Sequence, residues 1–287
     1  MPMEIDRKQI KQQARESMLL AKPSFWVVTL VYMLMTTGVS IIADFSDGTL
    51  GLFLTIAITM YSWVVGFSYR LWAIWTVRRL EPGLGSLMEG FSVAGRVIML
   101  ESSILVRTLG WTFMMAIPAG FLLVFSMTTN LLGYFLVIGL LSIAVSIITL
   151  RYSMAAYVLA DYPDLGPSYA LHQSVQLTRG WIGELVKLHL SFIGWYILST
   201  VLSFAGMMAG ALVSGGITIA ALLTPDGFAQ LPTVLSAGIP SLLGTLLSLP
   251  VTLYLTPYIE VTLAQFYDAR IRLADAAADP MGEMPPL

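Results

Sequence analysis

The residues of this chain that could do chemistry are ionisable groups at the edges of long apolar stretches. Arg107, Glu184, Lys187, Glu260 and Arg151 all lie in such places. Ionisable groups within a membrane are costly, and they mark ion pathways, proton relays or substrate sites. We therefore predict a polar cavity open to one side of the membrane, in which the two acids balance Arg107 and Lys187. The alternative is a set of structural ion pairs and of long side chains that reach the headgroups.

Spacing adds detail to this predicted cavity. Glu184 and Lys187 are three residues apart, so they share one face of a helix. Arg70 and Arg151 end two apolar stretches on the same side of the predicted membrane as the other charges.

A second candidate site is a helix break at Pro250 and Pro257. Each proline removes a backbone donor, which frees the carbonyl groups of Leu246 and Leu253. In transporters such breaks line ion sites or act as hinges. Prolines are also frequent in ordinary transmembrane helices, so a purely structural role is the alternative.

Motifs for enzymatic chemistry do not occur in the sequence. The chain has no cysteine and two histidines, and it lacks H-E-x-x-H, G-x-S-x-G and G-x-x-x-x-G-K-[ST] patterns. We expect no metal, no cofactor and no enzymatic activity.

Composition indicates which solvent surrounds these residues. Hydrophobic residues make up 57% of the chain and charged residues 11%, against roughly 25% charged in a typical soluble domain. So little charge cannot cover a water-exposed surface, and the lipid bilayer is the expected partner of the apolar surface. The net charge of -2 gives no reason to expect a nucleic-acid partner.

A helix needs about 20 mostly apolar residues to cross a membrane, and the sequence has room for six such helices. They are Ser24 to Ala43, Thr49 to Tyr69, two within Thr108 to Leu150, Leu190 to Pro225 and Gly227 to Ile259. The turn inside the long stretch is expected at Met127 to Asn130. The stretches do not alternate as barrel strands do, so we predict an all-α bundle of six transmembrane helices.

Lysine and arginine give this bundle an orientation. All of them lie before the first span, in alternate loops or after the last span. The other loops contain no lysine or arginine, and their charged residues are Asp44, Asp47 and Asp226. Positive charge is retained in the cytoplasm. We therefore expect both termini in the cytoplasm and the bundle in a bacterial plasma membrane.

The remaining segments complete the predicted domain plan. Residues 1–23 form an amphipathic segment that lies on the membrane with Ile10, Ala14, Met18 and Ala21 on its apolar face. Residues 24–272 form the transmembrane domain, and 273–287 form a disordered tail. Short amphipathic elements at 86–91 and 168–174 each precede a Gly-Trp pair, which suggests a repeat of helical hairpins. The segment 214–240 has too many glycines and prolines for one regular span.

The sequence L190-S-F-I-G-W195, followed later by Pro257-Tyr258 and by Thr262, Ala264, Phe266 and Tyr267, is similar to a known family. The stretch from Ser174 to Trp181 adds to this similarity. On these residues the last third of the chain resembles the bacterial domain-of-unknown-function family 975 of integral membrane proteins. The resemblance implies a polytopic membrane protein and implies no activity or catalytic residue.

Two functions fit these observations. The first is a non-enzymatic accessory or assembly partner, which would bind another membrane protein within the bilayer. The second is a small transporter or channel that uses the predicted charged cavity. The oligomeric state, the partner and the substrate do not follow from the sequence.

Overall fold

The protein is described from a computed structural model that covers residues 6–44, 48–129, 131–216, 224, 233–235 and 238–278. Within these ranges every long regular element is a helix, as the all-α prediction requires. The elements are α1 (Arg7–Leu20), α2 (Phe25–Asp44), α3 (Gly48–Val77), α4 (Ser86–Glu89), η1 (Gly90–Val93), α5 (Ala94–Thr129), α6 (Leu131–Thr149), η2 (Leu150–Tyr152), α7 (Ala155–Asp161), η3 (Pro163–Leu165), α8 (Gly166–Thr178), α9 (Ile182–Leu190), α10 (Ile193–Val213) and α13 (Gly238–Ala278).

These helices include the predicted membrane spans. Five helical segments within the described ranges are long and apolar enough to cross a membrane. The pair α1 and α2, bent by 87°, makes a sixth if the two helices form one span. Helix α5 ends at Thr129 and α6 begins at Leu131, so the stretch divides into two helices as predicted, but Met127 to Thr129 of the expected turn belong to α5 and Asn130 lies outside the described residues. The protein is therefore a multi-pass membrane protein by the length and composition of its helices.

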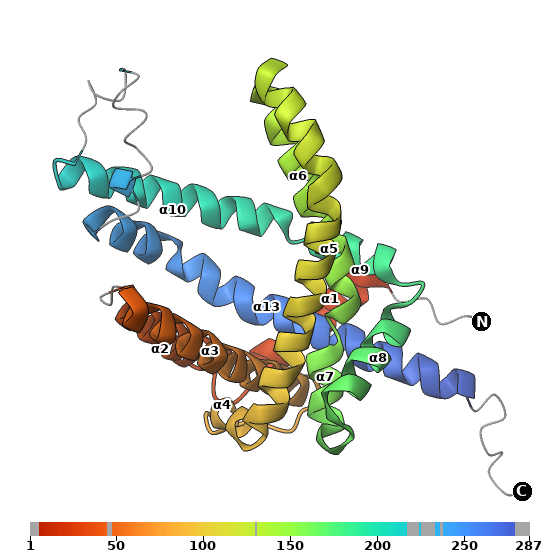
Figure 1. Ribbon diagram of the computed structural model, residues 1–287. Helices are drawn as coiled ribbons and strands as arrows, with labels where there is room; N and C mark the ends of the chain where they lie inside the picture. Colours follow the sequence, from red (N-terminus) through yellow and green to blue (C-terminus); the bar gives the residue numbers. More distant parts are fainter. Residues whose placement is uncertain are drawn as a thin grey trace, which may run out of the picture. The chain divides into compact units, whose positions relative to one another are not determined.

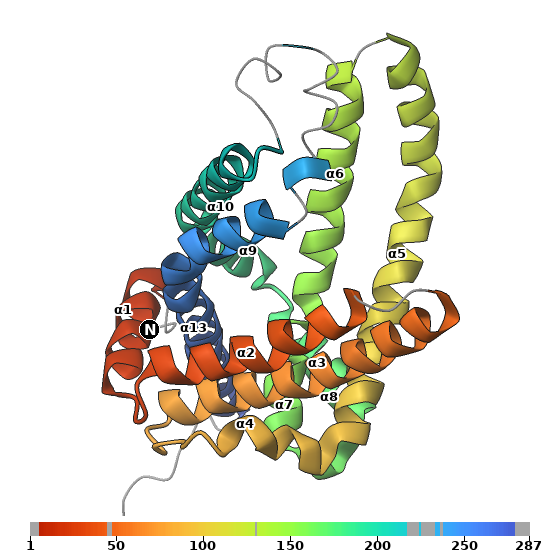
Figure 2. The same ribbon diagram turned by 90° about the vertical axis from the view of Figure 1, so that its left-hand side faces the viewer.

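The chain forms two compact units, one of residues 1–188 with 260–287 and one of residues 189–259. In the first unit, α2 packs along α3, and α5 and α6 form a long antiparallel hairpin (Figure 1). Helices α7 and α8 pack against each other and against α5, and α7 also packs against α3 (Figure 2). The largest fully buried side chains of this unit include Trp72, Tyr69 and Tyr157.

The second unit consists mainly of α10 and the first part of α13. Gly206 and Gly210 of α10 lie directly against the backbone of α13, because a Cβ atom on Gly206 would be 2.4 Å from the carbonyl oxygen of Leu243. At the start of α10, the rings of Phe192 and Tyr258 meet edge to face with centroids 5.2 Å apart. The G-x-x-x-G spacing therefore serves close helix packing inside this unit.

Two expectations need correction. The apolar face of α1 does not lie on lipid, because Ile10, Ala14 and Met18 are buried within the protein. Near the end of α1, Ser17 Oγ also accepts a hydrogen bond of 3.3 Å from Gln265 Nε2 of α13. Helix α13 continues to Ala278, so residues 273–278 are helical and only 279–287 of the expected tail lie outside the described residues.

The elements of the proposed repeat differ in length. The first consists of α4 and η1, with four residues each, whereas the second is the 13-residue α8. Their Gly-Trp pairs also differ in place, since Gly110 lies inside α5 and Gly194 lies in the first turn of α10. Most of the segment 214–240, including Asp226, lies outside the described residues.

Candidate functional site

The first charged cluster of the protein joins α3, α5, α7 and α13. Arg70 of α3 donates from Nη1 to Glu101 Oε1 of α5 over 2.9 Å. Its Nε lies 3.9 Å from Glu260 Oε2 of α13, and the Tyr157 hydroxyl of α7 donates to the same oxygen over 2.8 Å. The acids are mostly buried, with side chains 17% and 23% exposed. We call these four residues the Arg70 cluster.

Aromatic rings of α2 and α3 lie next to the Arg70 cluster. Tyr69, which precedes Arg70, is 2% exposed. Its hydroxyl forms a 2.7 Å hydrogen bond with Thr29 Oγ1, and its ring stacks on Tyr32 at a centroid distance of 4.3 Å. These contacts fix the α3 turn that carries Arg70 against α2.

The charges of the Arg70 cluster do not balance. One guanidinium faces two carboxylates, so with all groups ionised the cluster carries one excess negative charge. Arg70 stands seven residues before Val77, the end of α3, which places it about 10 Å from that end at 1.5 Å per residue. An excess negative charge at this depth attracts cations.

A second cluster lies at the end of α3, around Arg78, which directly follows Val77. Arg78 donates two hydrogen bonds to the carboxylate of Asp161, of 2.6 and 2.8 Å, and lies 3.0 Å from Asp268. The hydroxyl of Tyr267 donates to Asp161 over 2.9 Å, and Arg272 pairs with Asp268 at 2.9 Å. We call these five residues the Arg78 cluster.

In the Arg78 cluster, two arginines face two aspartates, so the charges balance. The hydrogen bonds from Arg78 to Asp161 raise the pKa of the Arg78 guanidinium above its ordinary value, and the group stays charged. Paired, forked hydrogen bonds of this type are among the strongest in proteins. The Arg78 cluster therefore fastens α3, α7 and the end of α13 to one another.

The structure separates the five residues of the predicted cavity. Glu260 belongs to the Arg70 cluster. Glu184 pairs with Lys187 at 2.7 Å on the same helix face, and also with Arg7 of α1 at 3.1 Å. These two acids therefore lie in different ion clusters within the described part of the chain.

The two remaining arginines of the prediction make other contacts. The guanidinium of Arg107 is exposed and lies 6.0 Å from the ring centroid of Tyr152. Arg151 contributes its backbone carbonyl, which accepts hydrogen bonds from Ser174 and Thr178 over 2.8 and 3.3 Å, while its side chain is exposed. Pro250 and Pro257 both lie inside α13, which remains one assigned helix through both prolines.

Sequence reasoning missed most members of the two clusters. Arg70 and Glu101 were visible as charges near span ends, but their sequence separation of 31 residues gave no sign that they meet. Arg78 and Asp268 are 190 residues apart. Among the residues that the structure describes, no group of three or more acids or histidines is arranged to hold a metal ion.

Several residues that carried the family resemblance are packing residues. Phe266 meets Trp181 edge to face at 6.5 Å, and Tyr267 stacks on Tyr157 at 5.5 Å. Trp181 in turn lies under the guanidinium of Arg270, 4.7 Å from the ring centroid. The quoted aromatic residues of α13 thus build its contacts with α7 and with the start of α9.

Comparison with known proteins agrees with this resemblance. A family model described as "Protein of unknown function (DUF975)" matches residues 1–273, far more than the last third of the chain. No curated protein and no solved structure matches the chain.

Proposed function

The chain belongs to the DUF975 family of proteins of unknown function, and from that premise we propose that it is a non-enzymatic accessory or assembly partner of another membrane protein. The observation that carries this proposal is the exposed apolar surface of the α5–α6 hairpin. No described side chain of α6 is buried. On α5, Phe113, Met114 and Ile117 are also exposed. Lipid or a partner helix can cover such an apolar surface.

One face of α6 has the composition of a helix–helix contact. Gly139, Ser142 and Ser146 are exposed and follow each other at intervals of three and four residues, so they lie on one face. A Cβ atom on Gly139 would meet nothing within 4 Å. Transmembrane helices associate through small residues of this kind, because they let two backbones approach closely.

The orientation belongs to the same proposal. We place both termini in the cytoplasm and the protein in a bacterial plasma membrane, because lysine and arginine lie only on one set of segments. With this orientation, the Arg78 cluster stands at the cytoplasmic end of α3.

Site-specific photocrosslinking in native membranes tests the accessory role. A photoreactive residue at Ile143, which lies next to Gly139 on α6, should crosslink to one protein. The same residue at Leu52, which is exposed on α3, should label lipid only. Identical crosslinking patterns at the two positions would contradict the proposal.

A matched pair of glycine variants separates a specific contact from chance proximity. Gly139→Leu should reduce the crosslink from Ile143 at least tenfold, because it fills the space for a partner backbone. Gly38→Leu on α2, where a Cβ atom also meets nothing within 4 Å, should leave it unchanged. An undiminished crosslink in Gly139→Leu would exclude the small-residue face as the contact.

The Arg70 cluster favours a second candidate, a small cation-coupled transporter. Its excess negative charge, about 10 Å from the end of α3, is the type of group that binds a coupling proton or cation. Purified protein in liposomes should then show saturable uptake driven by a proton or sodium gradient. Glu101→Gln would abolish that uptake, whereas Glu184→Gln, in a separate ion pair, would not. Absence of gradient-driven uptake over amino acids, peptides, drugs and lipids would remove this candidate.

A further inference from the structure

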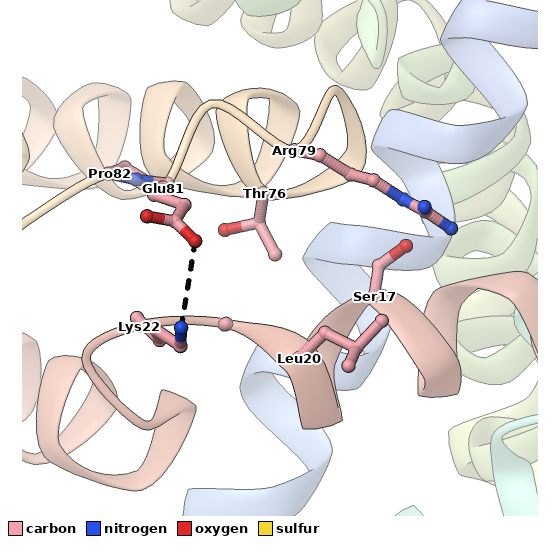
Figure 3. Close-up of a pocket in the computed structure, with 8 residues that line it drawn as sticks. Ser17, Leu20, Lys22, Thr76, Arg79, Glu81 and Pro82 are labelled. Atoms are coloured by element: carbon pink, nitrogen blue, oxygen red, sulfur yellow. Dashed lines mark ion pairs between the residues drawn. The ribbon is translucent and has the colours of Figure 1, made fainter.

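A pocket of about 250 Å³ lies between the end of α1 and the end of α3 (Figure 3), and its lining includes no member of the two charged clusters. It is lined by Ser17, Leu20, Ala21, Lys22, Thr76, Arg79, Glu81 and Pro82. Its volume is below the roughly 300–1,000 Å³ of pockets for drug-sized ligands, so it suits one small polar group.

A buried hydroxyl in this pocket lacks a partner. Thr76 is 4% exposed, and its Oγ1 has no hydrogen-bond partner among the described residues. Figure 3 shows its side chain pointing from α3 into the gap toward the end of α1. An unsatisfied buried hydroxyl destabilises the protein, and a ligand that accepts its hydrogen would remove this cost.

A second hydroxyl reaches the same space from the opposite side. Ser17 Oγ accepts a hydrogen bond from Gln265 Nε2, which leaves its own hydrogen available for donation. The pocket thus offers two hydroxyl donors, one from α1 and one from α3.

The charges around the pocket sum to one positive charge. Arg79 is exposed and forms no ion pair within the described ranges. Lys22 and Glu81 are 3.8 Å apart, with side chains 78% and 71% exposed. An exposed pair at this distance contributes little free energy, so an incoming anion can compete with Glu81 for Lys22. Two hydroxyl donors and a net positive charge of one suit a singly charged oxyanion.

The backbone of the pocket loop is strained at two of its lining residues. Arg79 has φ of 57° and Glu81 has φ of 48°, and neither is glycine. Left-handed conformations of such residues are strained and occur often at ligand-binding sites. Here they turn the loop so that Arg79 extends over Ser17 (Figure 3).

The position of the pocket identifies the source of the anion. It lies where α2 begins and α3 ends, which is the headgroup level of a bilayer crossed by these helices. Leu20 of its lining is exposed, and so are three leucines close to lining residues in the sequence, namely Leu19, Leu80 and Leu84. A soluble phosphate would leave these leucines uncovered, whereas the acyl chains of a lipid would cover them.

We propose that this pocket binds the phosphodiester group of a membrane phospholipid. Arg79 and Lys22 would pair with the anionic oxygens, and the hydroxyls of Thr76 and Ser17 would donate hydrogen bonds to them. This site is independent of the α5–α6 hairpin and of the accessory function.

Equilibrium titration of the purified full chain tests the site. The protein is held in a neutral maltoside detergent, and dihexanoyl phosphatidylglycerol is added while intrinsic tryptophan fluorescence is recorded. Arg79→Gln and Thr76→Val should each weaken binding at least tenfold. Arg179→Gln, an equally exposed arginine at the end of α8, should bind as the wild type does. Equal affinities of the Arg79 and Arg179 variants would overturn the site.

A second measurement excludes a trivial loss of fold. Without lipid, Thr76→Val should unfold at the same temperature as the wild type or higher, because it removes an unsatisfied hydroxyl. With lipid, the wild type should gain thermal stability and the variant should not. Lipid stabilisation of the variant equal to that of the wild type would contradict the role of Thr76.

Titration with inorganic phosphate and with glycerol phosphate distinguishes the two sources of the anion. Both should bind at least tenfold more weakly than the phospholipid, since neither covers the leucine border. Equal affinity for inorganic phosphate would overturn the assignment to a lipid.

Discussion

Replacing Gly206 by alanine should destabilise the protein, although alanine is the better helix former. A Cβ atom at this position would lie 2.4 Å from the carbonyl oxygen of Leu243 and 2.8 Å from Cα of Gly244. Ordinary contacts between heavy atoms are about 3.5–4.0 Å, so α10 and α13 would have to separate by about 1 Å. Both neighbours are backbone atoms and cannot rotate away.

The expected size of the effect follows from two opposing contributions. Overpacking costs about 1–3 kcal/mol, and the upper end applies because backbone meets backbone. The higher helix propensity of alanine offsets about 1 kcal/mol of this cost. The free energy of unfolding should therefore fall by about 2 kcal/mol.

Gly110→Ala provides the matched control. Gly110 lies inside α5, and a Cβ atom there meets nothing within 4 Å, so the substitution should be neutral or stabilise by up to about 1 kcal/mol. Reversible unfolding in mixed micelles, followed by circular dichroism, measures both variants. Equal stabilities of Gly206→Ala and Gly110→Ala would refute the close contact between α10 and α13.

Three other predictions concern the charged clusters and the topology. Arg78→Lys keeps the charge but loses the forked hydrogen bonds to α7, and should lower the unfolding free energy by about 2 kcal/mol in the same assay. A double-mutant cycle of Arg70→Met and Glu101→Gln should give a coupling energy of about 1–2 kcal/mol, and additive effects would contradict their contact. In this cysteine-free background, an impermeant thiol reagent on whole cells should label cysteine at Thr129 and leave cysteine at Arg79 unlabelled. The reverse pattern would invert the proposed orientation.

Helices were predictable here wherever local composition decides them. The uncharged stretch from Thr108 to Leu150 is about twice as long as one span, so a turn near its middle was required, and α5 ends at Thr129 while α6 begins at Leu131. The spacing of Gly206 and Gly210 is likewise a local property of the sequence, and it permits the close packing that the structure shows. Apolar length and glycine spacing need no knowledge of the neighbouring helices.

The sequence did not predict which residues cover an apolar helix face or pair with a charged side chain, because this depends on which helices become neighbours. The buried face of α1 has the periodicity of a membrane-surface helix, and periodicity does not distinguish lipid from protein as the covering medium. Likewise, the charges of Arg107 and Arg70 look equivalent in the sequence. Only the packing of α3 against α5 gives Arg70 a carboxylate within 2.9 Å, while Arg107 remains exposed.

The long sequence separation inside the Arg78 cluster has a consequence for biosynthesis. Arg78 meets Asp161, 83 residues later, and Asp268, 190 residues later. At about 5–20 residues per second, the ribosome adds Asp161 after about 4–17 s and Asp268 after about 10–40 s. Until Asp161 is added, Arg78 at the end of α3 has neither of its two partner carboxylates. Premature stops before residue 161 should therefore leave nascent chains that are degraded faster than chains ending between 161 and 268.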